Sequence, residues 1–292
     1  MKWLITGASG QLGLALQEEL TQRGIDFVGA NSTELDITKP LIVNQMVDLI
    51  KPSVIINAAA WTDVDGAESN ESTAYSVNAL GPQNIANAAR KSGARLVQIS
   101  TDYVFSGDAS TPWSEKTPHN PQSVYGSTKS EGENFVLATL PSNSYVVRTA
   151  WLYSPQGKNF AKNMVSLALN QKDEVRVVND HIGQPTFAGD LAKQIIELVL
   201  SEAPAGIYHG TNSGQATWFE FAQAIFSMIG ADTSRVIPVS TSNFPRPAKR
   251  PTYSVLGHDA WVHANVPAMR DWKIALKEAM PAIISALGKN DL

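Results

Sequence analysis

Tyr125 and Lys129 stand four residues apart and are the side chains of this chain best suited to proton transfer. The apolar pattern over residues 127–140 predicts a helix, and positions i and i+4 of a helix share one face. Because an ammonium group favours a neighbouring phenolate, we expect Lys129 to lower the pKa of Tyr125 below its ordinary value. Such a phenol can give or take a proton at neutral pH. Pairs with this spacing also occur on ordinary helix surfaces, so the pair alone does not establish an active site.

A glycine-rich segment near the start of the chain is the second chemical feature. Gly7, Gly10 and Gly13 follow a predicted strand and open a predicted helix, with Gln11 and Leu12 between them. Glycines let the backbone approach a pyrophosphate, and a helix N-terminus attracts its negative charge. The spacing is GxxGxxG, whereas the commonest dinucleotide fold has GxGxxG, and a helix start packed with small residues is the alternative. Its place at the first strand-to-helix turn favours dinucleotide binding.

The elements that must position these residues alternate through residues 1–200. Leu12, Leu16 and Leu20 recur every four residues, as in an amphipathic helix, and short apolar runs lie between such stretches. This alternation predicts an α/β fold, a Rossmann-type doubly wound parallel sheet with helices on both faces. The predicted strands cover residues 3–6, 27–29, 54–57, 96–100 and 145–148.

The composition changes after about residue 150, where turn residues and prolines become frequent. We expect residues 1–150, together with part of 160–205, to form a dinucleotide-binding domain. Residues 151–292 are expected to form mainly a smaller, mixed α/β substrate-binding region, interleaved with the first. Helical patterns over 219–228 and 272–287 belong to this second region.

The overall composition narrows the classes of function. Of the 292 residues, 43% are hydrophobic and 17% are charged, as in ordinary globular enzymes. A net charge of −4 gives no electrostatic footprint for nucleic acid, and no apolar run approaches the roughly 20 residues of a membrane span. The chain contains no cysteine, which excludes disulfides, thiolate metal sites and cysteine nucleophiles. The glycine loop begins too early for a signal peptide, so we expect a cytoplasmic protein without membrane or nucleic-acid partners.

The end of the second predicted strand bears on the choice of cofactor. An acidic residue there binds the ribose 2′-hydroxyl of NAD, whereas a basic one accommodates the 2′-phosphate of NADP. Asn31, Ser32 and Thr33 are neither, and they place no repelling carboxylate at the strand end. We therefore expect NADPH, with NADH as a second donor. Asp36 and Ile37 are expected against the adenine ring, unless Asp36 serves only as an acid at a helix N-terminus.

Several segments together resemble the extended short-chain dehydrogenase/reductases. They are the glycine loop at 6–13, Asn57-Ala58-Ala59-Ala60, Val77-Asn78, residues 100–105 and Tyr125-Gly126-Ser127-Thr128-Lys129. Within that group, the chain resembles the dTDP-4-dehydrorhamnose reductase family at residues 61–68, 148–153, 179–186 and 250–256. The resemblance runs in order from residue 1 to about residue 287.

This resemblance implies reduction of the C4 ketone of dTDP-4-dehydro-6-deoxy-L-mannose to dTDP-L-rhamnose, the last step of dTDP-rhamnose synthesis. Tyr125 would donate a proton to the developing alkoxide, while Lys129 would hold the nicotinamide ribose and lower the pKa of Tyr125. Thr101 would hydrogen-bond the carbonyl oxygen, in place of the serine of many short-chain reductases. Two hydroxyl donors placed in advance stabilise the charge that develops on this oxygen. Without Tyr125 and Lys129, Thr101 would be interpreted as a strand-end hydroxyl that caps the next turn.

The resemblance also implies contacts with the two ligands. The expected cofactor-binding residues, besides Tyr125 and Lys129, are Gly7, Gly10, Gln11, Leu12, Gly13, Asp36, Ile37, Ala58, Ala59, Ala60, Thr62, Asn78, Ile99 and Ser100. The expected substrate neighbours are Val64, Thr101, Asp102, Tyr103, Trp151, His181 and Arg250. Arg246 and Arg250 are spaced to meet a diphosphate, with a solvated basic loop as the alternative. For the three alanines, the alternative to cofactor binding is close packing of a helix on a strand. For Trp151, the alternative to a ligand contact is a place in the core. Asn78 in mid-helix suggests a side-chain hydrogen bond inside the site.

The chain departs from the family in two places. Some members are dimers bridged by a divalent cation, but Ala15 stands where an acidic residue of the first helix is expected. Glu18, Glu19 and Asp190 remain as oxygen ligands, yet their spacing marks no site, so we predict no metal and no Mg²⁺. A homodimer remains an expectation. The turn at 257–261 also differs from the family pattern.

Two other functions remain open at this point. The chain could be another nucleotide-sugar epimerase, dehydratase or reductase, although the segment after Thr101 lacks the glutamate that a dehydratase uses. It could instead be a non-catalytic regulatory subunit of methionine adenosyltransferase, which keeps the dinucleotide fold. The intact Tyr125, Lys129 and Thr101 favour catalysis over this last alternative.

Overall fold

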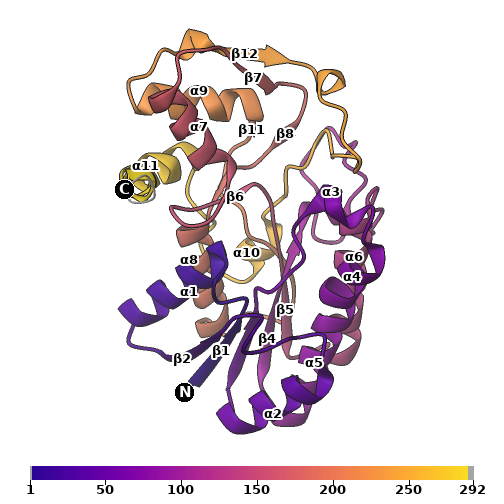
Figure 1. Cartoon of the computed structure of the whole chain (residues 1–292). Coiled ribbons are helices and arrows are strands. Elements are labelled where there is room, and N and C mark those ends of the chain that lie inside the picture. Colours follow the sequence, from indigo (N-terminus) through magenta and orange to yellow (C-terminus); the bar gives the residue numbers. More distant parts are fainter. Residues whose placement is uncertain (1, 289–292) are drawn as a thin grey trace.

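A parallel sheet forms the centre of the molecule, which the computed structural model describes for residues 2–288 (Figure 1). Within these residues, six strands lie side by side in the order β10-β5-β4-β3-β1-β2. Their bounds are β1 (Lys2–Thr6), β2 (Asp26–Ala30), β3 (Val54–Asn57), β4 (Arg95–Thr101), β5 (Ser144–Thr149) and β10 (Gly206–His209). All five predicted strands are confirmed, and the doubly wound α/β fold with them. β10 was not predicted, because its four residues make no distinct apolar run.

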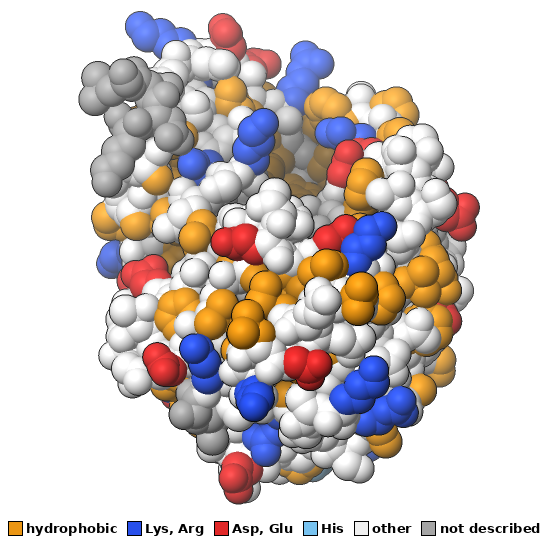
Figure 2. All heavy atoms as spheres, turned by 60° about the horizontal axis from the view of Figure 1, so that its bottom comes forward, with side chains coloured by type: hydrophobic (Ala, Val, Ile, Leu, Met, Phe, Trp, Pro, Cys, Tyr) orange, Lys and Arg blue, Asp and Glu red, His pale blue; other side chains and the backbone are white. Residues whose placement is uncertain are grey.

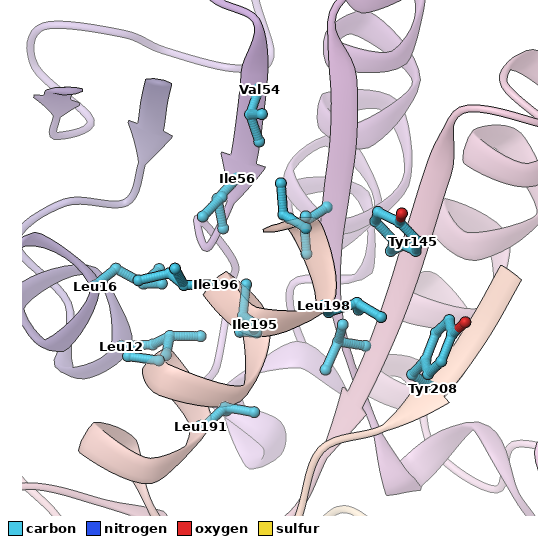
Figure 3. Packing of buried hydrophobic residues seen from close by; sticks show 14 of the residues in the cluster. Leu12, Leu16, Val54, Ile56, Tyr145, Leu191, Ile195, Ile196, Leu198 and Tyr208 are labelled. Carbon is cyan, nitrogen blue, oxygen red and sulfur yellow. The ribbon is translucent and has the colours of Figure 1, made fainter. Parts of the chain in front are cut away.

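Helices cover both faces of the sheet. On one face, Leu12 and Leu16 of α1 (Gln11–Gln22) and Leu191 and Ile195 of α8 (Ala188–Leu200) pack with Ile56 of β3, as Figure 3 shows. The leucine repeat is thus the buried stripe of an amphipathic helix. The other face is covered by α2 (Pro40–Ile50), α5 (Gly81–Ser92) and α6 (Val124–Thr139).

The remaining chain forms most of a second lobe, which lies above the sheet in Figure 1. The helices α7 (Phe160–Asn170), α9 (Trp218–Met228) and α11 (Trp272–Gly288) share a core rich in aromatic side chains. Three short strand pairs join it: β7 (Val175–Val178) with β12 (Val236–Val239), β8 (Ile182–Gly183) with β11 (Ala216–Thr217), and β6 (Leu152–Tyr153) with β9 (Thr186–Phe187). The helices predicted at 219–228 and 272–287 are confirmed to within one residue. Between α7 and α9 the chain returns to the sheet as α8 and β10.

The winding of the sheet locates its ligand-binding edge. From β1 the chain runs outward to β2 and then crosses to β3 on the other side of β1. Ligands of open α/β sheets bind outside the carboxyl ends of the strands at such a switch point. Four short elements follow the carboxyl ends of β3 and β4 in the chain: α3 (Val64–Ala67), α4 (Glu71–Tyr75), the π-helix η1 (Ser76–Leu80) and the 3₁₀ turn η2 (Asp102–Val104). The other short elements belong to the later part of the chain: η3 (Thr233–Arg235), η4 (Thr241–Asn243) and α10 (Asp259–His263).

The surface agrees with the low net charge. Acidic and basic side chains are intermingled on the face shown in Figure 2, with hydrophobic side chains between them. In the part of the chain that the structure describes, no helix combines the length and the hydropathy that crossing a membrane would need.

Candidate active site

A cleft of about 1180 Å³ lies at the carboxyl edge of the sheet, between the strand ends and the second lobe. Its walls include Gly7 after β1, Ala58 after β3, Thr101 at the end of β4 and Trp151 after β5. Trp218 of α9 belongs to the wall that the second lobe provides. Pockets for a single small ligand usually measure about 300–1,000 Å³, so this cleft lies at or above the upper end of that range.

The cleft brings together residues that are far apart in the sequence. Among residues 2–288, every residue predicted for the site lines it except Asn78. The Asn78 side chain is buried and exchanges hydrogen bonds with the backbone of Trp61, at 2.9 and 3.1 Å, and donates to Thr128 Oγ1 at 3.2 Å. Asn78 was expected to make a hydrogen bond inside the site and to contact the cofactor. Its hydrogen bonds instead lie beside the cleft, where they hold the chain after β3 in place.

The glycine loop fits a dinucleotide pyrophosphate. Gly7 has a φ of 67°, and a Cβ atom there would lie 2.6 Å from the Ala59 nitrogen. A Cβ atom on Gly13 would overlap the Gly7 carbonyl oxygen. The backbone therefore leaves no room for a side chain at Gly7 or at Gly13, and α1 begins directly after Gly10. The first backbone N–H groups of α1 have no partner within the helix, so the cradle offers donors and a positive helix end to a phosphate.

A loop of the second lobe closes onto the glycine loop. Gln11 Oε1 accepts hydrogen bonds from Ser154 Oγ at 3.1 Å and from Asn159 Nδ2 at 2.9 Å. Gly157 packs against the Gln11 side chain, and Lys158 beside it lines the cleft. Sequence reasoning missed Lys158, since nothing in its neighbourhood indicates that it lines the same cleft as the distant glycine loop.

The end of β2 differs from the expectation. Asn31 Oδ1 accepts hydrogen bonds from the backbone and hydroxyl of Thr33, and this turn brings the Glu34 carboxylate back to the Asn31 N–H, at 2.9 Å. A carboxylate therefore does stand near this strand end, contrary to the expectation, but Glu34 does not line the cleft and does not contradict the expected NADPH. The reason is local folding: Glu34 is four residues beyond Ala30 in sequence but is brought back by the turn. Asp36, whose pKa is lowered by hydrogen bonds from Thr38, lines the cleft a few residues later.

The helix α6 places Tyr125 and Lys129 at the cleft. It begins after Ser123, whose Oγ accepts a hydrogen bond from the Gly126 N–H at 3.2 Å, a regular N-cap. Gly126 leaves no room for a side chain, because its Cβ would overlap the Tyr103 carbonyl oxygen. The Tyr125 ring meets the Tyr103 ring edge to face, with centroids 5.4 Å apart. The glycine next to Tyr125 is therefore needed for α6 to approach the end of β4.

The expected effect of Lys129 on Tyr125 is not found in this structure. Lys129 Nζ donates a hydrogen bond to the Ile99 carbonyl oxygen at 2.5 Å, and burial lowers its own pKa to about 8. Burial raises the pKa of Tyr125 to about 12, although a hydrogen bond with Thr101 acts in the opposite direction. The prediction of an acidified phenol is wrong here, because removing the phenolate from water outweighs the favourable contacts.

Thr101 and Asp102 form a hydrogen-bonded pair at the end of β4. Thr101 Oγ1 donates to Asp102 Oδ1 at 2.9 Å and accepts from the Tyr103 N–H at 3.2 Å. Thr101 thus caps η2, as the alternative of a strand-end hydroxyl that caps the next turn predicted, and it also lines the cleft. Burial raises the pKa of Asp102 to about 6, although the nearby hydroxyls of Thr101 and Ser254 act in the opposite direction.

A buried ion pair lies behind these residues and was not predicted. Arg148 of β5 donates to both carboxylate oxygens of Glu133 of α6, from Nε at 3.0 and 3.1 Å and from Nη2 at 2.7 Å, and both side chains are buried. His119 Nε2 lies 3.0 Å from the same carboxylate. Although burial alone would raise the pKa of Glu133, the hydrogen bonds of His119 and Arg148 hold it near 2. The two residues belong to different elements and to no recognised motif, so the sequence pattern contained no signal for the pair.

Aromatic side chains form the wall of the second lobe. Trp151 stacks on Trp218 with ring centroids 3.6 Å apart, and Phe160 packs on Trp218 in turn. Trp151 has a φ of 46°, which is rare for a large residue and typical of functional sites. One face of the Trp151 indole, which was expected to pack on the sugar or the base, is thus covered by Trp218. Trp218 was missed because a tryptophan that opens a helix usually belongs to a core.

Arg246 and Arg250 both line the cleft and both meet Asp65 of α3. Arg250 Nη2 lies 2.9 Å from Asp65 Oδ2, and Arg246 Nη1 lies 3.7 Å from the same oxygen. His181 also lines the cleft, and its Nε2 lies 2.9 Å from Thr241 Oγ1. The basic segment of the second lobe is therefore joined to the edge of the sheet domain.

Two of the three acidic side chains considered as metal ligands form ion pairs, while Glu18 accepts a hydrogen bond from Gln22 at 3.4 Å. Glu19 accepts a hydrogen bond from Arg23 at 2.7 Å, and Asp190 accepts two from Arg270 at 2.8 Å. Within residues 2–288, no three His, Asp or Glu side chains are grouped so that they could hold a metal ion.

Comparisons with known proteins agree with the fold and the site. The family model described as the RmlD substrate binding domain matches residues 1–284. The chain is 44% identical over 99% of its length to a dTDP-4-dehydrorhamnose reductase of Streptomyces griseus, with 96% of that protein covered. It is 43% identical over 97% of each chain to a dTDP-4-keto-6-deoxy-D-glucose reductase of Streptomyces niveus.

A solved structure extends this agreement to three dimensions. The dTDP-4-dehydrorhamnose reductase of Bacillus anthracis, in complex with NADP, superposes with a TM-score of 0.92 at 41% identity and covers 96% of this chain and 98% of its own. Both the resemblance of the motifs and the predicted fold are confirmed by these matches. The chain therefore belongs to the family of the RmlD substrate binding domain, among the dTDP-4-dehydrorhamnose reductases and their close relatives.

Proposed function

We propose that this chain is an NADPH-dependent reductase that converts the C4 ketone of dTDP-4-dehydro-6-deoxy-L-mannose into the alcohol of dTDP-L-rhamnose. The observation that carries the proposal is the meeting of Tyr125, Lys129 and Thr101 in the same cleft as the glycine loop. This set supplies a proton donor and a carbonyl-binding hydroxyl beside a dinucleotide cradle. The names of the Streptomyces griseus and Bacillus anthracis relatives support the substrate.

The cofactor site is assigned from the cradle. Gly7, Gly10 and Gly13 would hold the pyrophosphate at the start of α1, and Lys129 would hold the nicotinamide ribose. The NADP complex of the Bacillus anthracis relative supports NADPH, and NADH remains a second donor. When bound, the reduced nicotinamide supplies the hydride that C4 receives.

The proton comes from the protein. At neutral pH the Tyr125 phenol is protonated, since burial raises its pKa to about 12. An alkoxide is a stronger base than a phenolate, so transfer of the Tyr125 proton to the developing alkoxide at C4 is downhill. A donor that keeps its proton until the alkoxide forms suits reduction, and this role does not require the acidified phenol that the sequence predicted.

The stereochemistry of the sugar gives a second candidate substrate. The Streptomyces niveus relative, at nearly the same identity, is named for the D-glucose isomer of the ketosugar. A stereoisomer of this kind carries the same C4 ketone, so a reductase for that isomer is the second candidate. An epimerase, a dehydratase or a regulatory subunit finds less support, because the curated relatives with 40–44% identity over at least 96% of the chain carry reductase names.

The setting of the reaction is also a proposal. Nucleotide sugars and reduced nicotinamide are metabolites of the cytoplasm, and we place the enzyme there. A homodimer stays a prediction.

The test is a reductase assay with two ketosugars. The absorbance of NADPH is followed with dTDP-4-dehydro-6-deoxy-L-mannose and, separately, with its D-glucose isomer, for the wild type and for Tyr125→Phe. We expect oxidation of NADPH with the L-mannose substrate and a loss of kcat of at least about 100-fold in the variant, the usual contribution of a positioned proton donor. A full rate in the variant, or no oxidation by the wild type with the first substrate, would contradict the proposal.

A further inference from the structure

Asp102 is a buried carboxyl group whose environment does not suit a negative charge. It is 3% exposed, and no ion pair of the described residues includes it. Its Oδ2 has no hydrogen-bond partner among these residues. Glu133, by contrast, is equally buried but is paired with Arg148. An unpaired buried carboxylate is costly, and such a group takes up a proton instead.

The groups that surround Asp102 are hydroxyls rather than cations. Tyr103 on η2, Tyr125 on α6 and Ser254 of the second lobe all lie close enough to influence it or to be influenced by it. Two cations line the cleft in this region. Lys129 Nζ donates to the Ile99 carbonyl oxygen, and Arg250 stands 5.9 Å from the Tyr103 ring and is bound to Asp65. Asp102 is therefore left without a charge partner, in keeping with a pKa that burial raises to about 6.

The hydrogen bonds of Thr101 make this protonation state important. Thr101 Oγ1 has one proton and two lone pairs, and one lone pair accepts the Tyr103 N–H. If Asp102 is ionised, the single proton of Thr101 must point to Asp102 Oδ1, 2.9 Å away. If Asp102 is protonated, its own proton can occupy that hydrogen bond, because Thr101 Oγ1 has a second lone pair. The Thr101 proton is then free to point into the cleft, toward the Tyr125 hydroxyl and toward a carbonyl oxygen bound beside it.

We propose that Asp102 is a positioning residue that acts in its protonated form, donating to Thr101 and so turning the Thr101 hydroxyl toward the carbonyl oxygen of the substrate. The chain of donors then runs from Asp102 through Thr101 to the ketone, beside the proton donor Tyr125. Deprotonation of Asp102 reverses this chain and removes one of the two donors to the carbonyl oxygen. The inference rests on the proposed reduction, because it needs a carbonyl oxygen in the cleft.

The pH profile of Asp102→Asn tests the inference. Asparagine has nearly the same shape and presents an N–H donor that does not titrate. We expect kcat/KM of the wild type to fall about tenfold as pH rises through and above the pKa of Asp102. This fall measures the loss of the Thr101 hydroxyl as a donor to the carbonyl oxygen. The variant should show no such fall, so that it matches or exceeds the wild type at high pH. A variant that keeps the wild-type profile would overturn the proposal.

Thr101→Val provides the matched control, since it removes the hydroxyl through which Asp102 acts. We expect it to lower kcat by roughly 10–100-fold and to abolish the effect of Asp102→Asn in the double variant. Independent, additive effects would show that Asp102 acts without Thr101 and would overturn the proposal.

A second measurement keeps the inference separate from the proposed reaction. Because folding raises the pKa of Asp102, its contribution to the unfolding free energy is most favourable at low pH and declines as pH rises from about 4 to about 6. Denaturant unfolding of Asp102→Asn should lack this decline. If the wild type reduces neither ketosugar, the proposed function fails, but the unfolding data still decide whether Asp102 is protonated in the fold; identical pH dependence in the variant would refute it.

Discussion

Gly7 is the residue at which two demands on the backbone coincide. Its φ of 67° lies in the left-handed region, which glycine adopts at no steric cost. Its Cα also faces the chain after β3 so closely that a Cβ atom would lie 2.6 Å from the Ala59 nitrogen. The first demand is conformational and the second is one of space, and both must be met for the cradle to reach a phosphate.

Gly7→Ala should therefore destabilise the fold and impair cofactor binding. We expect a loss of about 2–4 kcal/mol in unfolding free energy, from backbone strain together with overlap at Ala59. Binding of NADPH, measured by nicotinamide fluorescence, should weaken at least tenfold. Gly24→Ala is the matched control, because Gly24 has a similar φ of 65° with open space around it. It should cost about 1 kcal/mol and leave NADPH binding unchanged; equal effects of the two substitutions would contradict this account.

At the residue scale, the sequence predicted which residues belong to the site better than it predicted their protonation. The glycine spacing and the interval between Tyr125 and Lys129 can be read from neighbouring positions in the sequence, and all of these residues line the cleft. The pKa of Tyr125 is not local, because it depends on burial by segments that the sequence did not place. Glu34 shows the same limit on a smaller scale: one turn returned a carboxylate to a strand end that seemed to have none by spacing alone.

Among the elements, α6 connects the candidate catalytic residues to the core. Its first turn approaches η2 through Gly126, and its middle approaches η1 through Gly132, where a Cβ would overlap the Asn78 carbonyl oxygen. One turn beyond Lys129, α6 is attached to β5 by Glu133 and Arg148. Glu133 stands four residues after Lys129 on the same helix, so the attachment lies directly behind the lysine.

Glu133→Gln should test this attachment. Removing one partner of a buried ion pair leaves an uncompensated charge on Arg148, and we expect a loss of about 3–5 kcal/mol in unfolding free energy. Because folding lowers the pKa of Glu133 to about 2, its contribution is present above about pH 4.5 and is lost as pH falls toward 2. The variant should therefore lack this acid-sensitive component. Glu131→Gln, two residues earlier and less buried, is the control and should change the midpoint of denaturation little; an equal loss there would argue against the attachment.

Elements that form a periodic pattern were predictable, and those that depend on tertiary contacts were not. The strands of the sheet centre appear as apolar runs because both of their faces are buried. The π-helix η1 and the edge strand β10 have no such pattern, and their form follows from packing against α6 and β5. The same holds for α3, which is four residues long and receives Arg246 and Arg250 through Asp65.

On the scale of the whole molecule, the cleft is a product of two lobes that exchange chain segments. The glycine loop belongs to the sheet, yet Gln11 is bound by Ser154 and Asn159 of the second lobe. Helix α8 packs on α1 at the sheet and also carries Asp190, which binds Arg270 just before α11. The sequence indicated an interleaved second region but not these contacts, since each joins residues that are distant in the chain.

The Asp190–Arg270 pair offers a test of how the lobes are joined. Both oxygens of Asp190 accept hydrogen bonds from Arg270, and Oδ2 also accepts one from Asn212. We expect Asp190→Ala to lower the unfolding free energy by about 2–3 kcal/mol, since Asp190 is buried and Arg270 is partly exposed. Arg270 also pairs with Glu278, which is 56% exposed, so Glu278→Ala on the same arginine should cost at most about 1 kcal/mol. Because these hydrogen bonds occupy Asp190, thermal unfolding should be insensitive to Mg²⁺ and to a chelator. A midpoint that falls on chelation, or equal losses from the two alanine variants, would show that the lobes are joined in another way.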